Sequence, residues 1–522
     1  MVREKNIQLL KTSHHVWDFI VIGGGATGLG IAVDAASRGF KTVLLEQTDF
    51  AKLTSCKSTK LVHGGVRYLQ KGDIALVREA LRERGRLFRN APHLVKNQRF
   101  IIANYSWWEK PFYTIGLTMY DWLAGRLSLG RSLPMSKAQV IKSIPQIVQK
   151  GLRGGVLYHD GQFDDSRLAV NLMQTASEMG ATIVNHARVT GLLKNDGIVS
   201  GVTVCDETDG DTFELKGKCI VNATGILVDE VIRMDDKEKT PMVRPSQGIH
   251  LVVDRSFLGG DDVIMIPKTS DGRVLFAVPW HNRVIIGTTD TPVNEFVPEP
   301  KPLEEEIDFL LKTSAQYLAH PPQRKDVLCI FAGLRPLAAP KRLADEKKTK
   351  EISRSHKLIV SPSRLITITG GKWTTYRQMA QETVDLGIKR CGLPNKKCIT
   401  KELKIHGHQP TTDRSNWRYV YGSDSDKILA LQNEKPEYAE KLHLNFDFTV
   451  SEVVWAIREE MAVTVEDVLA RRVRALYLDA RASLEMAPKV ASIMAQEMKK
   501  DDRWIKKQIE EFTDLANGYI LK

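Results

Sequence analysis

The chain has 522 residues, of which 42% are hydrophobic and 26% are charged. This is the composition of an ordinary globular protein, and the length suggests two to four structural units at roughly 150 residues each. The sequence contains no run of about 18 apolar residues, which argues against a membrane-spanning helix. The N-terminal stretch lacks the long apolar core of a secretory signal, so we expect a protein on the cytosolic side.

The net charge is +12, and nucleic acid, an anionic membrane surface and an anionic substrate are the partners that such a charge allows. Lysine-rich solvated faces are expected to account for most of it. No nucleic-acid-binding signature is present, so no nucleic acid partner is predicted. The six cysteines are scattered without a C-x-x-C pair, which argues against a disulfide framework and a zinc site. No metal site is predicted, because His406 and His408 have no further ligand residue nearby.

A βαβ unit is predicted near the N-terminus. Residues 17–22 are a short apolar run typical of a buried strand, a helical pattern follows, and residues 41–46 form a second apolar run that ends on Glu46. The turn after the first strand has the pattern G-x-G-x-x-G, formed by Gly23, Gly25 and Gly28. Such glycines permit a tight turn, the approach of a pyrophosphate and close helix–strand packing. Glu46 is placed to bind a ribose hydroxyl, which favours FAD or NAD over NADP.

Two later segments, 216–225 and 365–377, are also predicted as strands that end in glycine turns. A chain that returns repeatedly to one nucleotide-binding sheet is typical of a large flavoprotein, which must hold FAD along its whole length. Gly370, Gly371 and Lys372 would bring backbone N–H groups and a cation to the flavin end. A plain helix N-terminus is the alternative interpretation of this segment.

Strands are predicted between residues 240 and 298, and helices after residue 398. We therefore predict an α/β and α+β protein with a Rossmann-like FAD-binding domain, an antiparallel-sheet substrate domain and a helical C-terminal domain. The predicted divisions are an N-terminal tail at 1–15, a discontinuous FAD-binding domain at 16–75, 150–235 and 355–390, a substrate domain at 76–149 and 236–354, and the C-terminal domain at 398–522.

Residues 107–124 are the most aromatic part of the chain. A buried helix or a wall of the substrate domain is the default expectation for them. A membrane-docking face is the alternative, which Arg126 and Arg131 would suit.

Three arginines stand in unusual contexts, namely Arg67 after a glycine pair, Arg335 before a proline, and Arg354. Converging arginines would bind a phosphorylated or carboxylated substrate, whereas each alone is expected at the surface or in an ion pair. His250, at the start of a predicted strand, fits a core position and a functional position equally well.

Several motifs in a fixed order carry a resemblance to a known family. They include "VIGGGATGLGIAVDAASRG", "TSCKSTKLVHGGVRYLQ", "APHLV", "VNATG", "IIGTTDT", "GLRPL", "GGKWTTYR" and "EEMAVTVEDVLARRVRALYLD". From about residue 15 to about residue 480 the chain resembles the FAD-dependent, quinone-linked glycerol-3-phosphate dehydrogenases, within the D-amino-acid-oxidase-like flavoproteins. The resemblance implies oxidation of sn-glycerol 3-phosphate to dihydroxyacetone phosphate, with a hydride passing from C2 to flavin N5 and electrons then passing to quinone. Cys56 and Lys57 interrupt the serine-rich stretch that the family often has.

The resemblance also implies site residues. Those expected at FAD are Gly23, Gly25, Gly28, Glu46, Thr54, Ser58, Lys60, Leu61, His63, Gly64, Val189, Ala223, Gly225, Gly370, Gly371, Lys372 and Thr374. Those expected at the substrate are Arg67, Tyr68, Arg335, Arg354 and Lys372. His63 is the candidate general base, since an imidazole with a pKa of about 6.5 can accept a proton at neutral pH. Arg335 would hold the phosphate, and Lys372 would stabilise negative charge on the flavin.

Three other functions remain open. A glycerol-3-phosphate oxidase would use oxygen in place of quinone, and another amine- or hydroxyl-oxidising flavoprotein would share the fold. A membrane-scaffold or nucleic-acid-binding protein would instead use the basic charge. The expected partners are glycerol 3-phosphate, a quinone and the inner-membrane surface, with peripheral attachment to its cytoplasmic face. A homodimer is left open.

Overall fold

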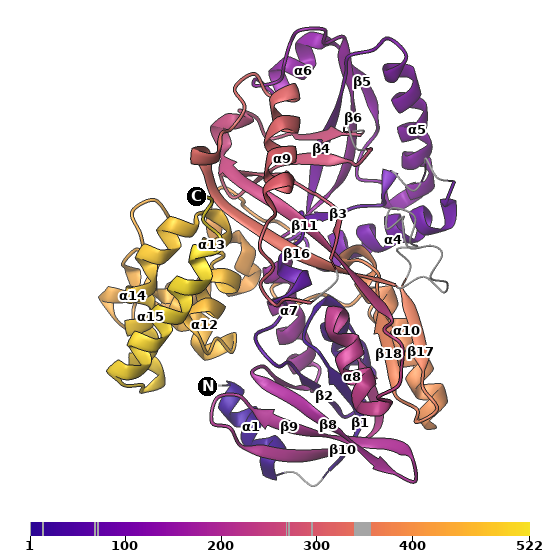
Figure 1. Cartoon of the computed structure of the whole chain (residues 1–522), viewed down its shortest axis with the longest axis vertical. Coiled ribbons are helices and arrows are strands. Elements are labelled where there is room, and N and C mark those ends of the chain that lie inside the picture. The colour runs from indigo at the N-terminus through magenta and orange to yellow at the C-terminus, as the bar shows by residue number, and fades with distance from the viewer. Residues whose placement is uncertain are drawn as a thin grey trace.

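Two β-sheets and a helical C-terminal region make up the computed structural model of the chain (Figure 1). The structure describes residues 2–12, 15–66, 69, 72–267, 269, 272–293, 296–338 and 356–522. Arg67, Tyr68 and Arg354 lie outside these ranges, so their predicted places at the substrate stay predictions.

The first sheet is built on parallel strands in the order β18-β10-β1-β2-β7, with β17 antiparallel to β18 at one edge. Its central strands are short runs of Val, Ile and Leu that are buried on both faces, as parallel strands covered by helices require. The strands are β1 (Val16–Ile22), β2 (Thr42–Leu45), β7 (Thr182–Val184), β10 (Thr212–Asn222), β17 (Lys357–Val360) and β18 (Ile366–Thr369), and the hairpin of β8 (Ala187–Asn195) and β9 (Ile198–Asp206) extends from β10. Helix α2 (Ala26–Ser37) contacts both α7 (Asp165–Glu178) and α10 (Tyr376–Cys391). The predicted Rossmann-like domain is confirmed.

The second sheet is almost entirely antiparallel, in the order β15-β11-β14-β13-β12-β4-β6-β3, with β16 on β11 and β5 on β6. Its strands are β3 (Leu61–Val62), β4 (Lys96–Asn104), β5 (Leu133–Met135), β6 (Gly154–Gln162), β11 (Val243–Asp254), β12 (Val263–Ile266), β13 (Leu275–Trp280), β14 (Arg283–Gly287), β15 (Thr291–Pro292) and β16 (Val327–Ala338). Alternation along β11 places Ile249 and Leu251 in a core between this sheet and the helices α6 (Lys137–Ser143) and α9 (Glu304–Tyr317) that pack on it. Val252 joins the other, larger core, so one face of the sheet turns toward the rest of the molecule.

Helices flank both sheets. They include α4 (Ile74–Asn90), α5 (Glu109–Ala124), α6 (Lys137–Ser143), α8 (Val228–Asp235) and α9 (Glu304–Tyr317). Helix α5 contacts β6 and α4, and lies at the edge of the molecule in Figure 1.

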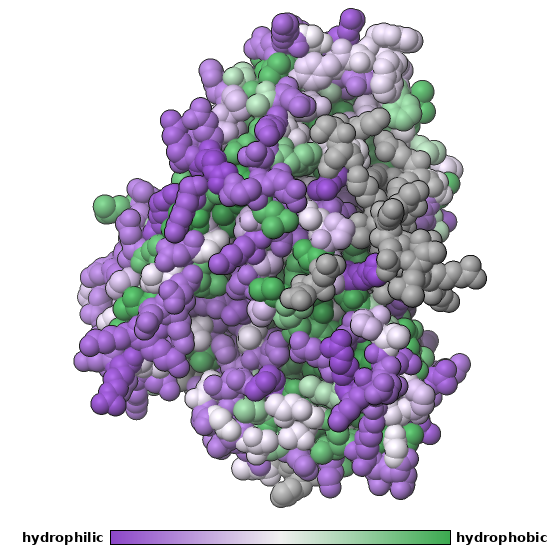
Figure 2. Space-filling model, in the orientation of Figure 1, coloured by the Kyte–Doolittle hydropathy of each residue, from purple (hydrophilic) through white to green (hydrophobic). Residues whose placement is uncertain are grey.

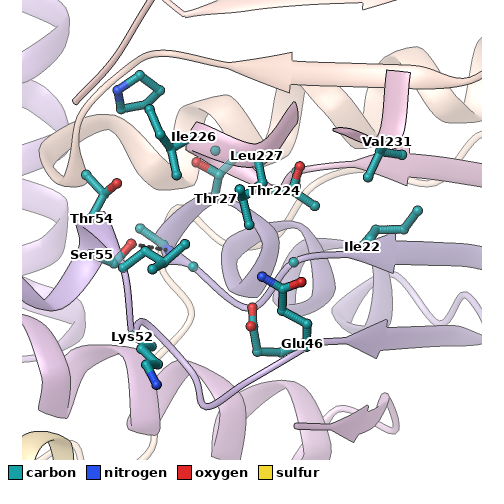
Figure 3. Close-up of a pocket in the computed structure, with 18 of the residues that line it drawn as sticks. Ile22, Thr27, Glu46, Lys52, Thr54, Ser55, Thr224, Ile226, Leu227 and Val231 are labelled. Atoms are coloured by element: carbon teal, nitrogen blue, oxygen red, sulfur yellow. Dashed lines mark hydrogen bonds between the residues drawn. The ribbon is translucent and has the colours of Figure 1, made fainter. Parts of the chain in front are cut away.

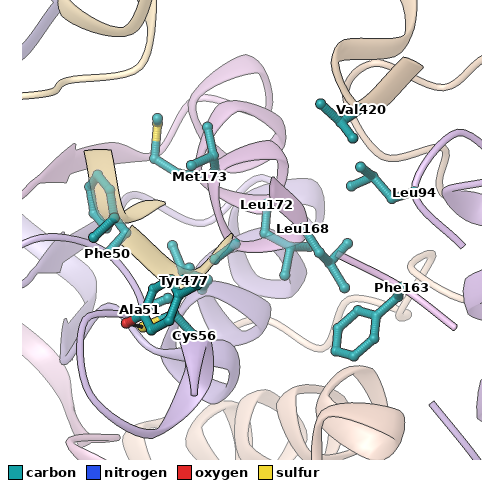
Figure 4. Close-up of a cluster of buried hydrophobic side chains, with 14 of the residues drawn as sticks. Phe50, Ala51, Cys56, Leu94, Phe163, Leu168, Leu172, Met173, Val420 and Tyr477 are labelled. Carbon is teal, nitrogen blue, oxygen red and sulfur yellow. Dashed lines mark hydrogen bonds between the residues drawn. The ribbon is translucent and has the colours of Figure 1, made fainter. Parts of the chain in front are cut away.

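The C-terminal region forms a helical unit beside the second sheet (Figure 1). It contains α11 (Ser425–Leu431), α12 (Val450–Glu459), a π-helical turn η11 (Asp467–Arg472), α13 (Ala475–Leu478), α14 (Ala480–Met498) and α15 (Asp502–Asn517). Its outer face carries largely hydrophilic side chains (Figure 2). Its inner face contributes Tyr477 to the cluster of Figure 4, where the Tyr477 hydroxyl lies 3.1 Å from the Cys56 sulfur. The core is therefore shared between the C-terminal helices, α7 and the segment after β2.

Two features differ from the predicted divisions. The segment expected as a tail forms helix α1 (Val2–Thr12), because Arg3, Ile7 and Leu10 share one buried face and Arg3 pairs with Asp206 at 2.6 Å. Strands β3 and β6 fall within ranges assigned to the FAD-binding domain, yet they pair in the antiparallel sheet. The chain thus crosses between the two sheets more often than the sequence pattern indicated.

Candidate active site

A cavity of about 310 Å³ lies where the strands of the first sheet end. Its walls come from the ends of β1 and β2, the N-terminus of α2, residues 46–55, β8, residues 223–234 and the turn at 370–373. In Figure 3 the side chains of Glu46, Thr54, Ser55 and Thr224 surround it. Ligands of open α/β sheets bind at the carboxyl ends of the strands, so this is the expected place for a dinucleotide.

The glycines of the first turn are required by close backbone contacts. Gly23 has φ of +107°, and a Cβ atom there would lie 2.8 Å from the carbonyl oxygen of Ala223. A Cβ atom on Gly28 would lie 1.9 Å from the carbonyl oxygen of Gly23. Gly25 is the N-cap of α2 and brings no side chain into the cavity, so an anion can approach the positive end of the helix dipole.

Glu46 is fixed in the cavity wall by three hydrogen bonds. One carboxylate oxygen accepts from the backbone N–H of Gly24 at 2.6 Å, and the other from the N–H and the hydroxyl of Thr48 at 2.9 and 3.0 Å. Burial raises the pKa of Glu46, while these donors act to lower it. The carboxylate is therefore held where a ribose hydroxyl can reach it.

The turn at Gly370 and Gly371 forms another part of the cavity wall, with φ of +79° and +80°. The positive φ favours glycine here, and a Cβ atom on Gly371 would also lie 2.3 Å from the sulfur of Met379. Lys372 lines the cavity directly after it. The indole N–H of Trp373 donates to the Ser55 carbonyl oxygen at 2.8 Å, which joins this turn to the segment after β2.

The predicted cofactor residues divide into two groups. Those that line the cavity are Gly23, Gly25, Glu46, Thr54, Val189, Ala223, Gly225, Gly370, Gly371 and Lys372. Gly28, Ser58, Lys60, Leu61, His63, Gly64 and Thr374 are not part of its lining. The segment at 63–64 is held beside the turn, since the N–H of His63 donates to the Thr374 hydroxyl at 3.2 Å and that of Gly64 to the Tyr120 hydroxyl at 2.7 Å.

The side chain of Lys60 does not line the cavity, and its predicted place at FAD stays a prediction. It is fully buried, and its ammonium donates to both oxygens of Asp165 at 2.7 and 2.8 Å and to the carbonyl oxygen of Cys56 at 2.7 Å. The rings of Trp280, Phe331 and Tyr477 lie 5.1 to 5.8 Å from this ammonium. The Ser58 hydroxyl donates to the same aspartate at 2.6 Å. These two side chains fold the segment before His63 and do not reach the cavity.

Arg335 lies on β16, next to Pro336, which lines the cavity. Its guanidinium donates to the Thr288 hydroxyl at 2.9 Å and to the Gln247 carbonyl oxygen at 3.3 Å, and lies 3.5 Å from Asp290. On the neighbouring strand β11, a Cβ atom on Gly248 would lie 2.2 Å from this guanidinium. The strand glycine therefore provides the space that the arginine occupies.

His250 lies two residues further along β11, on the sheet face that turns toward the cofactor domain. Its Nε2 is 2.9 Å from the hydroxyl of Thr59, and a Cβ atom on the facing Gly287 would lie 2.3 Å from the ring. Burial, and then the charges of Arg335 and Lys60, hold the pKa of His250 well below its ordinary value. The imidazole is therefore neutral, a state that fits a core position as well as a functional one.

Sequence reasoning did not find the residues that join these parts. Ser55 is such a residue, because its hydroxyl accepts from the Ala26 N–H at 3.0 Å and its carbonyl oxygen accepts from Trp373. Thr54 was expected at FAD, but its bond to the Leu334 carbonyl oxygen at 2.7 Å was not. For Arg335 and His250 the strand glycines at 248 and 287 were an available signal, because a strand glycine often marks a close approach.

Comparisons with known proteins agree with this geometry. Residues 18–377 match the family model described as FAD dependent oxidoreductase, and residues 361–504 match that of the C-terminal domain of alpha-glycerophosphate oxidase. The chain is thus an FAD-dependent oxidoreductase, and the glycine turn, Glu46 and the two-glycine turn fit FAD as its cofactor.

The relatives define the class more narrowly. The chain is 37% identical to the mitochondrial glycerol-3-phosphate dehydrogenase of Schizosaccharomyces pombe, over 96% of this chain and 87% of that protein. It is 36% identical to the human mitochondrial protein of the same name, over 97% of this chain and 74% of the relative. The solved glycerol-3-phosphate dehydrogenase of Bacillus halodurans, complexed with FAD, superimposes with a TM-score of 0.81 at 27% identity, covering 99% of this chain and 98% of that one. The chain belongs to the FAD-dependent glycerol-3-phosphate dehydrogenase family.

Proposed function

We propose that the protein oxidises sn-glycerol 3-phosphate at C2 to dihydroxyacetone phosphate and passes the electrons to a quinone. The observation that carries the proposal is that strand β16 reaches the wall of the cofactor cavity. Pro336 lines the cavity together with Lys372, and Arg335 beside it presents a guanidinium fixed by Thr288 and Gln247. A fixed guanidinium next to the cofactor suits a small phosphorylated substrate.

FAD, when bound, supplies the hydride acceptor. The chain must hold the phosphate group of the substrate. Arg335 is the candidate within the described residues, and Arg67, Tyr68 and Arg354 stay predicted from the sequence. Lys372 places a cation at the two-glycine turn, where it would favour negative charge on the reduced cofactor. A base must also accept the proton of the C2 hydroxyl. Two histidines are candidates, His63 from the segment beside the turn and His250 from β11.

The surface of α5 supports a quinone as the acceptor. Among the described residues no helix has both the length and the apolar character that crossing a bilayer demands. Large apolar side chains nevertheless point outward along α5 and the residues before it, and Trp107 and Trp122 are 77% and 80% exposed. The exposed set is Trp107, Trp108, Phe112, Ile115, Met119 and Trp122. From Trp108 on, these residues recur every three or four positions, which places them on one face.

Exposed Arg126 and Arg131 follow this apolar face. Hydrophobic side chains also reach the edge of the molecule beside α5 in Figure 2. A helix with aromatic residues on one face and cations nearby is typical of an element that lies in the membrane interface, where quinones dissolve. The buried helix expected by default is thus only half buried, through Leu117, Tyr120 and Ala124.

The reaction is tested on the anaerobic holoenzyme. We expect sn-glycerol 3-phosphate to bleach the flavin absorbance, and glycerol and a D-amino acid to leave it unchanged. Bleaching by the amino acid alone would instead identify an amine-oxidising flavoprotein. Fast reoxidation by quinone supports the dehydrogenase, whereas fast reoxidation by oxygen with release of peroxide identifies an oxidase.

Membrane attachment is tested by flotation with vesicles of phosphatidylcholine and phosphatidylglycerol. We expect the wild type to float with anionic vesicles and the double variant Trp107→Ser/Trp122→Ser to float much less. Leu444→Ser is the matched control, because Leu444 is 92% exposed in the C-terminal region. Equal flotation of all three proteins would assign attachment to another surface.

A further inference from the structure

A second cavity, of about 410 Å³, lies between the antiparallel sheet and the C-terminal region. Its walls come from the turn of the β13–β14 hairpin at 279–283, from Lys96 and Arg255, and from residues 414–419 and 445–448. It shares no lining residue with the cofactor cavity within the described ranges. Its volume falls in the range typical of sites for small organic molecules.

The walls carry more positive than negative charge. Asp261 is paired with Arg255, and Asp447 is paired at 2.7 Å with Lys441. Arg414 donates instead to the carbonyl oxygens of Pro92 and Val95, at 2.6 and 3.1 Å, so these contacts leave its charge uncompensated.

Lys96 is the second uncompensated cation. No hydrogen bond or ion pair with a described residue engages its ammonium. Burial, and then the charge of Arg414, lower the pKa of Lys96 to about 8. Lys96 remains a cation at neutral pH. An anion in the cavity would offset both the burial of the ammonium and its repulsion by Arg414.

The cavity also has donors without acceptors. The indole N–H groups of Trp280 and Trp417 and the Nε of Arg283 are buried and have no hydrogen-bond partner among the described residues. A buried donor without an acceptor is unfavourable by about 1–3 kcal/mol. These donors belong to residues of the wall, and the two uncompensated cations beside them fit an anionic ligand.

The remaining wall is aromatic. Phe446 stacks on Phe448 with ring centroids 5.2 Å apart, Trp417 meets Phe448 edge-on at 4.7 Å, and the Arg283 guanidinium lies 5.5 Å from the centre of the Phe446 ring. Such a wall packs against a flat apolar group.

We propose that this cavity is a binding site for an organic anion, a phosphate or carboxylate joined to an aromatic or flat apolar group. Lys96 and Arg414 bind the anionic end, and the aromatic wall, which includes Trp417, binds the ring. Trp280 connects the site to the cofactor side, because its ring lies 5.1 Å from the Lys60 ammonium, and Lys60 shares Asp165 with Ser58. A ligand here is therefore placed to affect the segment that precedes His63.

The test uses phenyl phosphate as the probe, titrated into the holoenzyme by calorimetry. Lys96→Met removes the uncompensated cation, Trp417→Phe removes one N–H and keeps a ring, and Lys312→Met is the control, because Lys312 is exposed outside both cavities. Arg335→Lys separates this site from the proposed substrate site. Inorganic phosphate and phenol are titrated separately, to measure the affinity of the site for the anionic half and for the aromatic half of the probe.

We expect phenyl phosphate to bind the wild type, Lys312→Met and Arg335→Lys alike, and to bind Lys96→Met about tenfold more weakly or worse. Trp417→Phe should weaken binding less, and each half-ligand should bind more weakly than phenyl phosphate. Loss of binding in Arg335→Lys with Lys96→Met unaffected would place the probe at the substrate site and overturn the proposal. Absence of binding to the wild type would overturn it as well. The outcome does not depend on the identity of the electron acceptor or of the oxidised substrate.

Discussion

The carboxylate of Asp49 accepts two hydrogen bonds from the guanidinium of Arg472, at 2.7 and 2.8 Å, across 423 positions of the sequence. Arg471 donates to the same carboxylate from the Nε atom at 2.5 Å, and Asn185 donates at 3.1 Å. Asp49 follows Thr48 in the segment that lines the cofactor cavity. The π-helical turn η11 lets two consecutive arginines reach one aspartate, so the C-terminal region holds this segment in place.

Asp49→Asn is expected to weaken cofactor binding as well as the fold. Removing one partner of a buried ion pair leaves the other charge uncompensated, which lowers the free energy of unfolding by about 3 kcal/mol or more. Because Asp49 lies between the lining residues Thr48 and Ala51, we expect the dissociation constant of FAD to rise by about tenfold or more, which is ~1.4 kcal/mol. Flavin fluorescence during a thermal ramp measures cofactor release, and circular dichroism measures unfolding.

Lys441→Gln is the matched control, because its ion pair with Asp447 is exposed. It should change the free energy of unfolding by less than about 1 kcal/mol and leave FAD affinity unchanged. If Asp49→Asn lowered the unfolding temperature and left the FAD dissociation constant unchanged, the contact would support the fold alone.

Gly248→Ala is expected to raise KM for glycerol 3-phosphate. The added Cβ atom would lie 2.2 Å from the Arg335 guanidinium and 2.6 Å from the Thr288 hydroxyl, so the arginine must leave its place. A charged hydrogen bond contributes about 1.5–3 kcal/mol, which corresponds to an increase in KM of roughly ten- to a hundredfold with a smaller change in kcat. Steady-state kinetics measure both constants. Gly116→Ala, where a Cβ atom meets nothing within 4 Å, is the control, and an unchanged KM in Gly248→Ala would remove Arg335 from the phosphate site.

The parts of the site that are formed by residues adjacent in the sequence could be predicted from the sequence. The glycine turn, Glu46 and the turn at 370–373 each follow a strand directly, and all line the cavity. Their chemistry is local, since a tight turn requires glycine and the end of a strand presents a carboxylate to a ribose.

Contacts between distant strands could not be predicted in this way. Lys60 lies three positions before His63, but its partner Asp165 is 105 positions away, so its burial depends on how the two segments pack. The places of Arg335 and His250 depend on the register of β11 against β14 and β16, which a single sequence does not give. The exposed face of α5 was equally ambiguous, because an apolar stripe has the same spacing in a core helix and in a docking helix.

The pH dependence of turnover separates the two candidate bases. Because the pKa of His250 is held well below its ordinary value, a reaction that uses this base keeps its kcat/KM constant as the pH falls through about 6.5. His250→Gln should then lower kcat by about a hundredfold or more, and His63→Gln should lower it less. A kcat/KM that falls on the acid side, together with a larger loss in His63→Gln, would assign proton abstraction to His63. Flavin absorbance of both variants verifies that FAD stays bound.

The last prediction concerns acid stability and rests on His93. This residue is fully buried, its Nε2 lies 3.1 Å from the Asn171 amide oxygen, and burial lowers its pKa to about 4. The unfolded chain, with an ordinary pKa of about 6.5, takes up the proton first as the pH falls, so stability is lost between these two values. At about pH 5 the loss from this group is about 2 kcal/mol relative to neutral pH. His93→Gln should reduce the difference in unfolding free energy between neutral pH and about pH 5 by this amount, measured by denaturant titration. His320→Gln, at an exposed histidine, should leave the difference unchanged, and an equal loss in wild type and His93→Gln would contradict the assignment.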